Sequence, residues 1–351
     1  MRPPGGGGNI KIVVVGDAGT SPEYFAKMAS NLAFEDAHVV ALEWPGTIAE
    51  IQARLLNIEL NGPEAEAPPA ALIEEIIDAD VLLVHVCPVP DAVIRAGKNL
   101  RLIGLCRGGL DNLDVNSALR QGIKIFHVVR NAEPVADFTL GLILAETRNI
   151  ARGHASILQG GWRKKFSNSA NTTTLRELRV GLLGLGNIGR LLADKLTALG
   201  VEVWGWDPYL PDAALGGMRI ERRSIEEIFT ECDVVSVHLR HSEETDKLVG
   251  RDLIERMKPS SYLINTSRAA IIDEGALVEA LTRKKIAGAA LDVLWEEPLP
   301  AGSALLALDN VTLTPHIAGD TVDAIPKSPK LLVEVINDYL RHGRTDFLVT
   351  K

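Results

Sequence analysis

Residues 180–189 read VGLLGLGNIG, an apolar run that leads into a Gly-x-Gly-x-x-Gly loop. The run has the composition of a buried β-strand, and residues 188–199 after it have the pattern of a helix. In such a unit the first glycine permits the tight turn, the second lets the backbone approach a pyrophosphate, and the third allows close packing of helix on strand. The segment therefore predicts a doubly wound sheet with a dinucleotide site that contains Gly184, Gly186, Asn187, Ile188 and Gly189.

An acidic residue follows this loop at the expected distance. Asp207 ends the next strand candidate, about 20 residues past the last glycine of the loop. A carboxylate there binds the ribose hydroxyls of NAD and repels the 2′-phosphate of NADP, so the pattern predicts NAD as the cofactor. The alternative is a glycine-rich turn with an unrelated acid.

Composition narrows the class of protein. A chain of 351 residues suggests about two domains, and a net charge of −9 without a basic block disfavours nucleic acid and anionic membranes as partners. The cysteines, Cys87, Cys106 and Cys232, fit neither a disulfide framework nor a metal site, so we expect reduced thiols and a cytoplasmic location. No apolar stretch is long enough for a membrane span, and the glycine-rich residues 1–8 lack the apolar core of a signal peptide, which predicts a flexible tail.

The first half alternates strand-like and helical segments, as in a parallel sheet covered on both faces. The strand candidates are Ile10–Val15, Val81–Val86, Leu102–Leu105 and Ile123–Phe126, and the helical patterns are Pro22–Phe34, Ile48–Leu60 and Asn112–Gln121. A long helix is expected from about Glu133 to about Leu158, with Pro134 in its first turn and two glycines after its end.

The second half repeats this alternation with six strand candidates, as in a doubly wound nucleotide-binding sheet. They are Arg179–Leu183, Val201–Trp206, Val234–His238, Tyr262–Asn265, Ala287–Leu291 and Val311–Thr314. An amphipathic pattern over Lys330–Leu340 predicts a last helix that packs back on the first half. We therefore predict an α/β protein with two parallel-sheet domains, a Rossmann domain at residues 148–321 inserted in a flavodoxin-like substrate domain at residues 9–147 and 322–351.

Three polar residues follow strand candidates of the second half and suit catalysis. Arg268 could hold a carboxylate with both arms of its guanidinium and draw charge from an adjacent carbonyl. His316 is the residue type that donates and accepts protons near neutral pH, and Glu297 could orient the imidazole and stabilise its protonated form. Taken singly, each has an ordinary alternative: a surface ion pair for Arg268, a packed histidine for His316, and a solvated acid for Glu297, with Glu296 as its competitor.

The whole chain resembles the NAD-dependent D-2-hydroxyacid dehydrogenases, the group that contains phosphoglycerate dehydrogenase, glyoxylate/hydroxypyruvate reductase and formate dehydrogenase. The matching segments are Gly184–Gly189, Ile264–Arg268 with Ile271-Ile272-Asp273, Ala289–Pro298 and Thr312–Gly319, preceded by Leu100–Asp114 and Asn131–Asp137. The first 80 or so residues match only in pattern.

The resemblance implies roles for particular residues. It implies that Arg268 binds the substrate carboxylate and carbonyl, that His316 is the general acid/base, and that Glu297 is its partner. It also implies that Asp292 contacts the nicotinamide carboxamide and Asp207 the adenosine ribose. The predicted cofactor site further includes His238, Thr266 and Gly319. The implied activity is hydride transfer between NAD(H) and C2 of a D-2-hydroxy acid or 2-oxo acid.

Two arginines stand where many family members carry other residues, and they bear on the substrate. Arg107 precedes Gly108 and Gly109 in a stretch that is usually Gly/Ala-rich, and Arg240 occupies a place where many members have Pro. If both face the substrate, they suit a second anionic or polyhydroxy end, so we predict a sugar acid or phosphorylated hydroxy acid. The alternative is that they pair with local acids such as Asp111 and Glu243.

Other functions and the assembly state remain open at this level. One alternative is a binding protein, since some relatives bind NAD to set their oligomeric state and act as corepressors. Among enzymes, the nearest alternative is a glyoxylate/hydroxypyruvate reductase. A formate dehydrogenase is a weaker option, because it should have Gln in place of Glu297. With no domain after residue 351, we expect no serine-type feedback control. The apolar stretch Phe138–Leu144 predicts a homodimer, unless these residues are simply buried within one chain.

Overall fold

The protein is described by a computed structural model that covers residues 10–210, 217, 219–345 and 347–350. The expected tail at residues 1–8 lies outside the described residues. The chain divides into two compact units: Met1–Arg130 with Thr321–Lys351, and Asn131–Asp320. We call them the N-terminal unit and the C-terminal unit. The N-terminal unit is built from two separate pieces of chain because the C-terminal unit is inserted within it.

The first crossing between the units lies earlier in the chain than the predicted boundary at residue 147. Helix α6 (Ala132–Thr147) belongs to the C-terminal unit, because its apolar face is buried there. Ala136, Leu142 and Ile143 pack with strand residue Val180 and helix residue Leu192 in one hydrophobic cluster. Packing, rather than any break in the sequence pattern, therefore fixes this boundary.

The N-terminal unit contains a six-stranded sheet in the order β13-β5-β4-β3-β1-β2. Its strands are β1 (Ile10–Gly16), β2 (Ala37–Glu43), β3 (Val81–Val84), β4 (Leu102–Leu105), β5 (Lys124–His127) and β13 (Leu348–Val349). All pairs are parallel except β13 with β5. The order of the five parallel strands is the flavodoxin-like order 2-1-3-4-5, as predicted. The sequence patterns missed β2, an edge strand with no fully buried residue.

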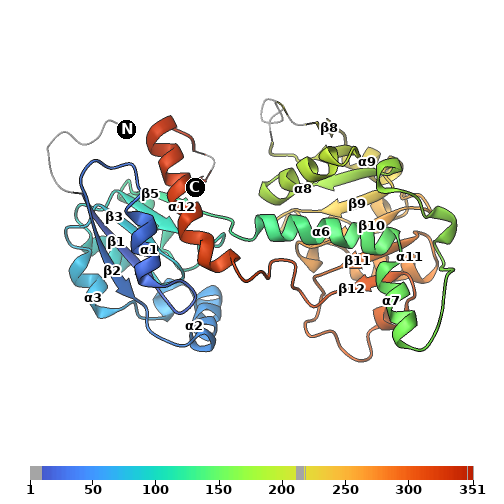
Figure 1. Ribbon diagram of the computed structural model, residues 1–351, viewed down its shortest axis with the longest axis horizontal. Helices are drawn as coiled ribbons and strands as arrows, with labels where there is room; N and C mark the ends of the chain where they lie inside the picture. The colour runs from blue at the N-terminus through green and yellow to red at the C-terminus, as the bar shows by residue number, and fades with distance from the viewer. Residues whose placement is uncertain (1–9, 211–216, 218, 346, 351) are drawn as a thin grey trace. The chain divides into compact units, whose positions relative to one another are not determined.

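Side chains of β1 alternate between two cores, one on each face of this sheet. Val13 and Val15 belong to the core on one face, whereas Ile12 and Val14 belong to the core on the other. The first core is covered by α2 (Ile48–Asn61), α3 (Ala70–Glu75), α4 (Asp91–Ala96) and α5 (Val115–Arg120). The second is covered by α1 (Pro22–Ala29) and α12 (Ala324–His342), which run alongside each other over the sheet (Figure 1). The last helix therefore completes the first unit, as the sequence predicted.

The C-terminal unit contains a seven-stranded, wholly parallel sheet in the order β12-β11-β10-β9-β6-β7-β8. Its strands are β6 (Arg179–Leu183), β7 (Glu202–Trp206), β8 (Glu221–Arg222), β9 (Val234–Val237), β10 (Tyr262–Asn265), β11 (Gly288–Leu291) and β12 (Val311–Leu313). Helices α6 and α8 (Asn187–Ala198) cover one face, and α9 (Ile225–Glu231), α10 (Arg251–Ile254) and α11 (Glu274–Thr282) cover the other. This is the predicted Rossmann arrangement, with its strand order reversing between β6 and β9.

The expected single helix from Glu133 to Leu158 is two helices, so that prediction is wrong. α6 ends at Thr147, and α7 (Ile150–Leu158) begins after Asn149, whose φ of 58° lies in the left-handed region. Asparagine is one of the few residues that adopt this conformation readily. The Arg152 guanidinium then spans the break, since it pairs with the buried Glu146 carboxylate and donates to Oδ1 of Asn149 at 2.8 Å.

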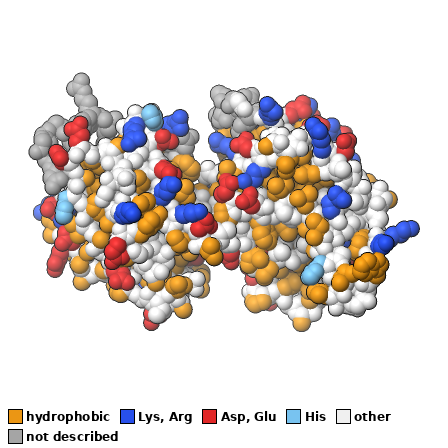
Figure 2. Space-filling view, in the orientation of Figure 1, with side chains coloured by type: hydrophobic (Ala, Val, Ile, Leu, Met, Phe, Trp, Pro, Cys, Tyr) orange, Lys and Arg blue, Asp and Glu red, His pale blue; other side chains and the backbone are white. Residues whose placement is uncertain are grey.

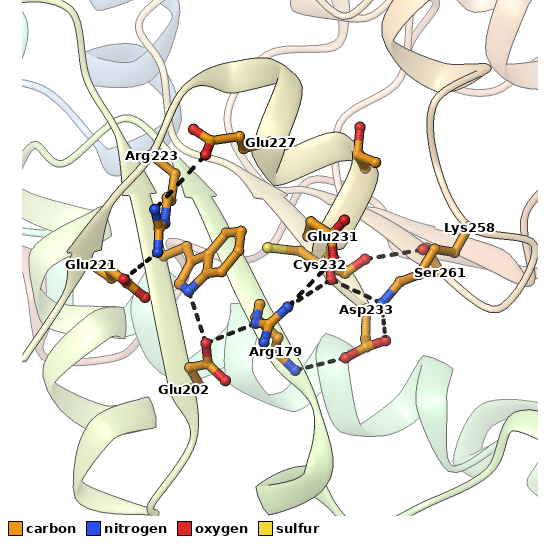
Figure 3. A network of polar contacts seen from close by, with 12 residues as sticks. Arg179, Glu202, Glu221, Arg223, Glu227, Glu231, Cys232, Asp233, Lys258 and Ser261 are labelled. Atoms are coloured by element: carbon orange, nitrogen blue, oxygen red, sulfur yellow. Dashed lines mark hydrogen bonds and ion pairs between the residues drawn. The ribbon is translucent and has the colours of Figure 1, made fainter.

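A polar network joins the amino ends of β6, β7 and β9 in the C-terminal unit (Figure 3). Arg179 pairs with Glu202 at 2.8 Å and stacks on the Trp204 ring at 4.4 Å, and Arg223 stacks on the same ring at 4.7 Å. Lys258 pairs with Asp233 at 2.5 Å. Ligands of open parallel sheets bind at the carboxyl ends of strands, so this network at the amino ends is structural.

Candidate functional site

The glycine loop follows β6 and lies at the point where the strand order of the C-terminal unit reverses. Gly184 has a φ of 95°, and a Cβ on it would lie 2.8 Å from the carbonyl oxygen of His238, which directly follows the neighbouring strand β9. A Cβ on Gly189 would lie 2.1 Å from the carbonyl oxygen of Gly184. Only glycine fits these two positions, so both glycines hold the loop close to the sheet.

The middle of the loop is open to a ligand. A Cβ on Gly186 would meet no atom within 4 Å, and Gly186 and Asn187 are exposed at the start of α8. The first N–H groups of a helix have no partner within the helix and attract anions. Ile188, in the same first turn, is half-buried. The loop therefore has the open backbone and the exposed helix N-terminus that a dinucleotide pyrophosphate requires.

The acidic residue after β7 is tied to this loop. Oδ2 of Asp207 accepts a hydrogen bond from the N–H of Leu185 at 2.9 Å, and Oδ1 accepts one from the N–H of Tyr209 at 2.9 Å. Each carboxylate oxygen keeps a further acceptor position. Asp207 is therefore held beside the glycine loop with capacity left for a ribose hydroxyl, and the residues present fit NAD.

The predicted contact between His316 and Glu297 is present, and we call these two residues the acid/base pair after the role predicted for them. Nδ1 of His316 lies 2.8 Å from Oε2 of Glu297, and Oε1 of Glu297 accepts from the N–H of Leu294 at 2.9 Å. Both side chains are accessible, with exposed fractions of 46% for His316 and 39% for Glu297. Glu297, and not Glu296, takes this role. Within the described residues Nε2 of His316 has no partner, so one ring nitrogen is oriented and the other is available.

The third predicted catalytic residue, Arg268, acts electrostatically on this pair. Partial burial acts to raise the pKa of Glu297, but the Leu294 N–H, the His316 ring and the charge of Arg268 outweigh it and hold the pKa below its ordinary value. The Arg268 guanidinium is exposed and donates to the carbonyl of Ser267 at 2.7 Å. The carboxylate of Glu297 therefore stays ionised next to His316, close enough to Arg268 for its charge to act.

The loop that carries His316 is fixed by Asp292, the fully buried residue that follows β11. Oδ1 of Asp292 accepts from Oγ1 of Thr314 at 2.6 Å and from the N–H of Ile317 at 3.1 Å, and Oδ2 accepts from the N–H of Ala318 at 2.9 Å. His316 itself has a φ of 56°. Sequence reasoning assigned Asp292 only to the cofactor and missed this second role, for which the sequence carries no signal.

The remaining predicted cofactor residues also occupy the carboxyl ends of strands. His238 follows β9, with Nε2 at 2.8 Å from Oγ of Ser236, and burial lowers the pKa of its imidazole to about 4. Thr266 follows β10, and its hydroxyl lies 2.8 Å from that of Thr139 on α6. Gly319 follows the His316 loop, and its site for a Cβ lies 3.2 Å from Nδ2 of Asn131. Their contact with a cofactor stays a prediction.

An apolar cavity of about 420 Å³ adjoins the acid/base pair within the C-terminal unit. It is lined by Leu294, Glu297, Pro298, Leu299, Leu306, Leu313, Thr314, Pro315 and His316. Apart from the pair and Thr314, every one of these side chains is apolar, so one side of the pair faces an apolar wall.

The predicted substrate residues lie apart from one another in the chain and differ in their surroundings. Nη2 of Arg107 lies 2.5 Å from Glu59 and 3.6 Å from Asp111, so the local-acid alternative holds for Arg107. A Cβ on Gly109 would lie 2.6 Å from the Asp111 carboxylate, whereas one on Gly108 would meet nothing closer than 3.8 Å.

Arg240 differs from Arg107. It lies in the exposed loop after β9, where its carbonyl accepts from Oγ1 of Thr245 at 2.8 Å. Its guanidinium has no ion-pair partner among the described residues, Glu243 included. Arg240 therefore keeps a free cation on the carboxyl side of the sheet.

Comparison with known proteins adds to this geometry. Residues 140–318 match the sequence model of the family described as D-isomer specific 2-hydroxyacid dehydrogenase, NAD binding domain. The chain is 37% identical over 274 residues to the D-3-phosphoglycerate dehydrogenase of Methanocaldococcus jannaschii, which covers 77% of this chain but only 51% of that protein. It is also 37% identical over 270 residues to the hydroxypyruvate reductase of Thermotoga maritima, covering 76% of this chain and 86% of the reductase.

The chain thus spans about half the length of the phosphoglycerate dehydrogenase that it matches. Among solved structures, the NAD-complexed D-isomer specific 2-hydroxyacid dehydrogenase of Lactobacillus delbrueckii ssp. bulgaricus aligns with a TM-score of 0.70 at 20% identity. That alignment covers 97% of this chain and all of the other. It shows a shared fold along the whole length.

Proposed function

Because the chain belongs to the D-isomer specific 2-hydroxyacid dehydrogenase family, we propose that it interconverts a D-2-hydroxy acid and the matching 2-oxo acid. NAD(H), when bound, supplies or accepts the hydride at C2 of the acid. The glycine loop and Asp207 would hold this cofactor, through the exposed N-terminus of α8 and the free acceptor positions of the carboxylate.

The observation that carries the proposal is the pair formed by His316 and Glu297. Glu297 holds Nδ1 of His316 and stabilises the charge that the ring gains with a proton. Nε2 would then give this proton to the oxygen at C2 during reduction, and take it back during oxidation. Arg268 would bind the carboxylate of the acid and polarise the carbonyl at C2, so that the negative charge that builds on its oxygen as the hydride arrives is stabilised.

For the substrate, we propose a sugar acid or a phosphorylated hydroxy acid in preference to lactate or glycolate. The free guanidinium of Arg240 supports this choice, because it belongs to the same unit as the acid/base pair and has no carboxylate of its own. Arg107 supports it less, since Glu59 and Asp111 already balance its charge.

A homodimer and a cytoplasmic location complete the proposal. Most of Phe138–Leu144 is buried or half-buried in the core of its own unit, so this stretch is not the dimer surface we would choose. α7 is a better candidate, since Ile150, Ile157 and Leu158 are 59%, 50% and 73% exposed, and apolar side chains gather in that part of the C-terminal unit (Figure 2). The proposed cytoplasmic location rests on the cysteines: all three are free and buried, which suits a reducing compartment. No helix among the described residues has the apolar length of a bilayer span.

The test is a spectrophotometric assay of NADH oxidation over a panel of 2-oxo acids. The panel includes pyruvate, glyoxylate, hydroxypyruvate, phosphohydroxypyruvate and 2-oxo sugar acids, each assayed with NADH and with NADPH. We expect turnover with NADH and the highest kcat/KM with a phosphorylated or polyhydroxy substrate, by about tenfold or more over pyruvate. No turnover of any member with either cofactor would remove the proposed activity, and a highest kcat/KM with pyruvate or glyoxylate would remove the proposed substrate class.

A further inference from the structure

A second cluster of polar side chains lies at the carboxyl ends of strands, in the N-terminal unit. Asp17 follows β1, His85 follows β3, Arg107 lies two residues past β4, and Arg130 lies three residues past β5. In this sheet the strand order reverses between β1 and β3, and open α/β sheets bind ligands outside the carboxyl ends of strands at that point. Asp17 and His85 flank the reversal, and no part of the proposed reaction uses them.

The hydrogen bonds of this cluster fix the state of His85. Its Nδ1 lies 2.7 Å and 2.9 Å from the two carboxylate oxygens of Asp17, and its Nε2 lies 2.5 Å from Nη1 of Arg130. A guanidinium can only donate, so Nε2 accepts and the single ring proton is on Nδ1, directed at Asp17. Burial, opposed by Asp17 but aided by Arg130 and Arg107, lowers the pKa of His85. His85 is therefore neutral and bridges a carboxylate to a guanidinium.

One nitrogen of the Arg130 guanidinium, Nη1, has hydrogen-bond partners, and the other two, Nε and Nη2, have none among the described residues. Nη1 donates to His85 and to the carbonyl of Cys106 at 3.2 Å. Nε and Nη2 have no protein partner among the described residues, and no described carboxylate lies within ion-pairing distance. Asp17 makes no direct hydrogen bond or ion pair to Arg130, although its charge acts to raise the pKa of Arg130. Oδ1 of Asp17 also accepts from the N–H of Gly19 at 2.8 Å.

Arg130 lies close to a second guanidinium, that of Arg107. Burial and the charge of Arg107 lower the pKa of Arg130, so the two guanidinium groups are close enough to repel each other. Arg107 is more than nine-tenths buried, and its Nη1 is itself buried without a hydrogen-bond partner. Arg107 has carboxylate partners in Glu59 and Asp111, whereas Arg130 has none within ion-pairing distance among the described residues. Withdrawing an unpaired guanidinium from water is costly, and a bound anion would relieve this cost for Arg130.

We propose that these groups form an oxyanion site at the carboxyl edge of the N-terminal sheet. Arg130 is the residue that binds the anion, through the free part of its guanidinium. His85, held by Asp17, is a positioning residue: it fixes Nη1 of Arg130 and so orients Nε and Nη2 of the same guanidinium. Arg107, whose charge Glu59 and Asp111 balance, contributes its buried Nη1 as a further donor without a partner. The ligand is a phosphate or carboxylate group, either the second anionic group of the substrate or a free anion.

Calorimetric titration of the full chain with inorganic phosphate tests the site without any need for catalysis. Wild type should bind phosphate saturably, and Arg130→Gln should weaken binding about tenfold or more, the ratio expected for losing a charge-assisted contact. Arg95→Gln is the matched control, since Arg95 is an exposed arginine of the same unit, and it should bind phosphate as wild type does. Absence of saturable binding in wild type, or equal binding by Arg130→Gln, overturns the proposal.

Two variants of His85 separate positioning from general loss of structure. A glutamine can accept from Arg130 with its oxygen and donate to Asp17 with its nitrogen, so His85→Gln should largely keep phosphate binding, whereas His85→Leu should lose it. If His85→Leu fails to fold, phosphate binding by His85→Gln and Arg130→Gln still tests the site. Wild-type binding by a folded His85→Leu, or equal loss in both His85 variants, overturns the positioning role.

A kinetic comparison identifies the source of the anion, and this arm alone rests on the proposed dehydrogenase activity. If the anion belongs to the substrate, Arg130→Gln should raise KM for phosphohydroxypyruvate about tenfold or more relative to its effect on hydroxypyruvate. If phosphate binding falls while that KM ratio stays as in wild type, the ligand is a free anion. Both results support the site. Failure of the activity itself would leave the phosphate titration unaffected, so the two proposals fail separately.

Discussion

A histidine–carboxylate pair at the carboxyl edge of the sheet in each unit, His316 with Glu297 and His85 with Asp17, allows a comparison, because the two pairs differ in their access to water. His316 and Glu297 lie 2.8 Å apart with 46% and 39% of their side chains exposed, whereas His85 and Asp17 lie 2.7 Å apart with 4% and 0% exposed. In the exposed pair one ring nitrogen is free. In the buried pair the second nitrogen accepts from Arg130.

The difference shows that a histidine–carboxylate contact does not by itself define an acid/base catalyst. A ring that exchanges protons needs a free nitrogen and room for the charge that it gains. His316 has both, whereas His85 is enclosed and faces a guanidinium, which excludes the protonated ring. The same contact therefore suits proton transfer in one unit and positioning in the other, as we propose.

The largest effect should come from the exposed pair. His316→Ala should lower kcat by roughly 10²–10⁴ and leave the dissociation constant of NADH near that of wild type, because it removes the proton donor and not the nucleotide site. Steady-state kinetics and a fluorescence titration with NADH measure the two quantities. His38→Ala, at an exposed histidine of β2, is the control and should have wild-type kcat. A wild-type kcat in His316→Ala would show that His316 is not the proton donor.

The partner of His316 should have a smaller, pH-dependent effect. Glu297→Gln should lower kcat for reduction at neutral pH by roughly tenfold, which corresponds to about 1.4 kcal/mol of lost stabilisation of the charged ring. Since the carboxylate favours the protonated ring, its loss should move the decline of activity with rising pH to lower pH. Because the pKa of Glu297 is lowered, the wild-type pair should persist as pH falls to the ordinary range for glutamate and be lost only below it. A pH–rate profile of Glu297→Gln that coincides with that of wild type would contradict this role.

A third prediction tests whether burial, rather than the partner, decides the state of a charge. Burial raises the pKa of Glu146 from 4.5 to about 6, and Arg152 and the Thr312 hydroxyl oppose this only in part. The fold therefore favours the neutral acid, and this contribution is complete below pH 4.5 and is lost as pH rises through 6. Relative to Glu146→Gln, the free energy of unfolding of wild type should fall by about 2 kcal/mol across that window.

Denaturant unfolding followed by tryptophan fluorescence measures this change, because four tryptophans, Trp162, Trp204, Trp206 and Trp295, lie in the C-terminal unit. Glu133→Gln, at an exposed position of the same helix, is the control and should run parallel to wild type. The idea fails if wild type and Glu146→Gln keep a constant difference over the whole pH range.

The smallest effect is expected at the amino edge of the same sheet. Arg179→Ala removes an ion pair to Glu202 that is open to water and a stack on the Trp204 ring, so it should cost only about 1 kcal/mol of unfolding free energy. Catalysis should be as in wild type, because the network lies at the strand ends opposite the site. A loss above about 3 kcal/mol would mean that the network acts as a buried ion pair, and a fall in kcat would mean that the two edges are coupled.

The sequence could predict which residues lie together at the C-terminal site because each of them belongs to a local pattern. The glycine loop, Asp207, Arg268 and His316 each follow an apolar run, and the ends of parallel strands meet at one edge of a sheet. The order of these elements along the chain is therefore enough to bring their side chains together. The same logic predicted both strand orders and the return of the last helix to the first unit.

Other features depended on contacts between distant parts of the chain. The break at Asn149 and the boundary before α6 follow from packing and from a left-handed residue within a sequence that is otherwise helical. Asp17, His85 and Arg130 are single polar residues without a motif, separated by whole strands and helices.

The sequence by itself determined the two folds, the glycine loop and the candidate positions of Arg268 and His316, because local periodicity and short motifs encode them. Only the tertiary structure decided which carboxylate holds His316, which acids neutralise Arg107, and which arginine has guanidinium nitrogens without a partner among the described residues. The physical reason is that hydrogen bonds and charges depend on distances of a few ångströms between groups that lie far apart in the chain, and those distances exist only once the sheets have formed.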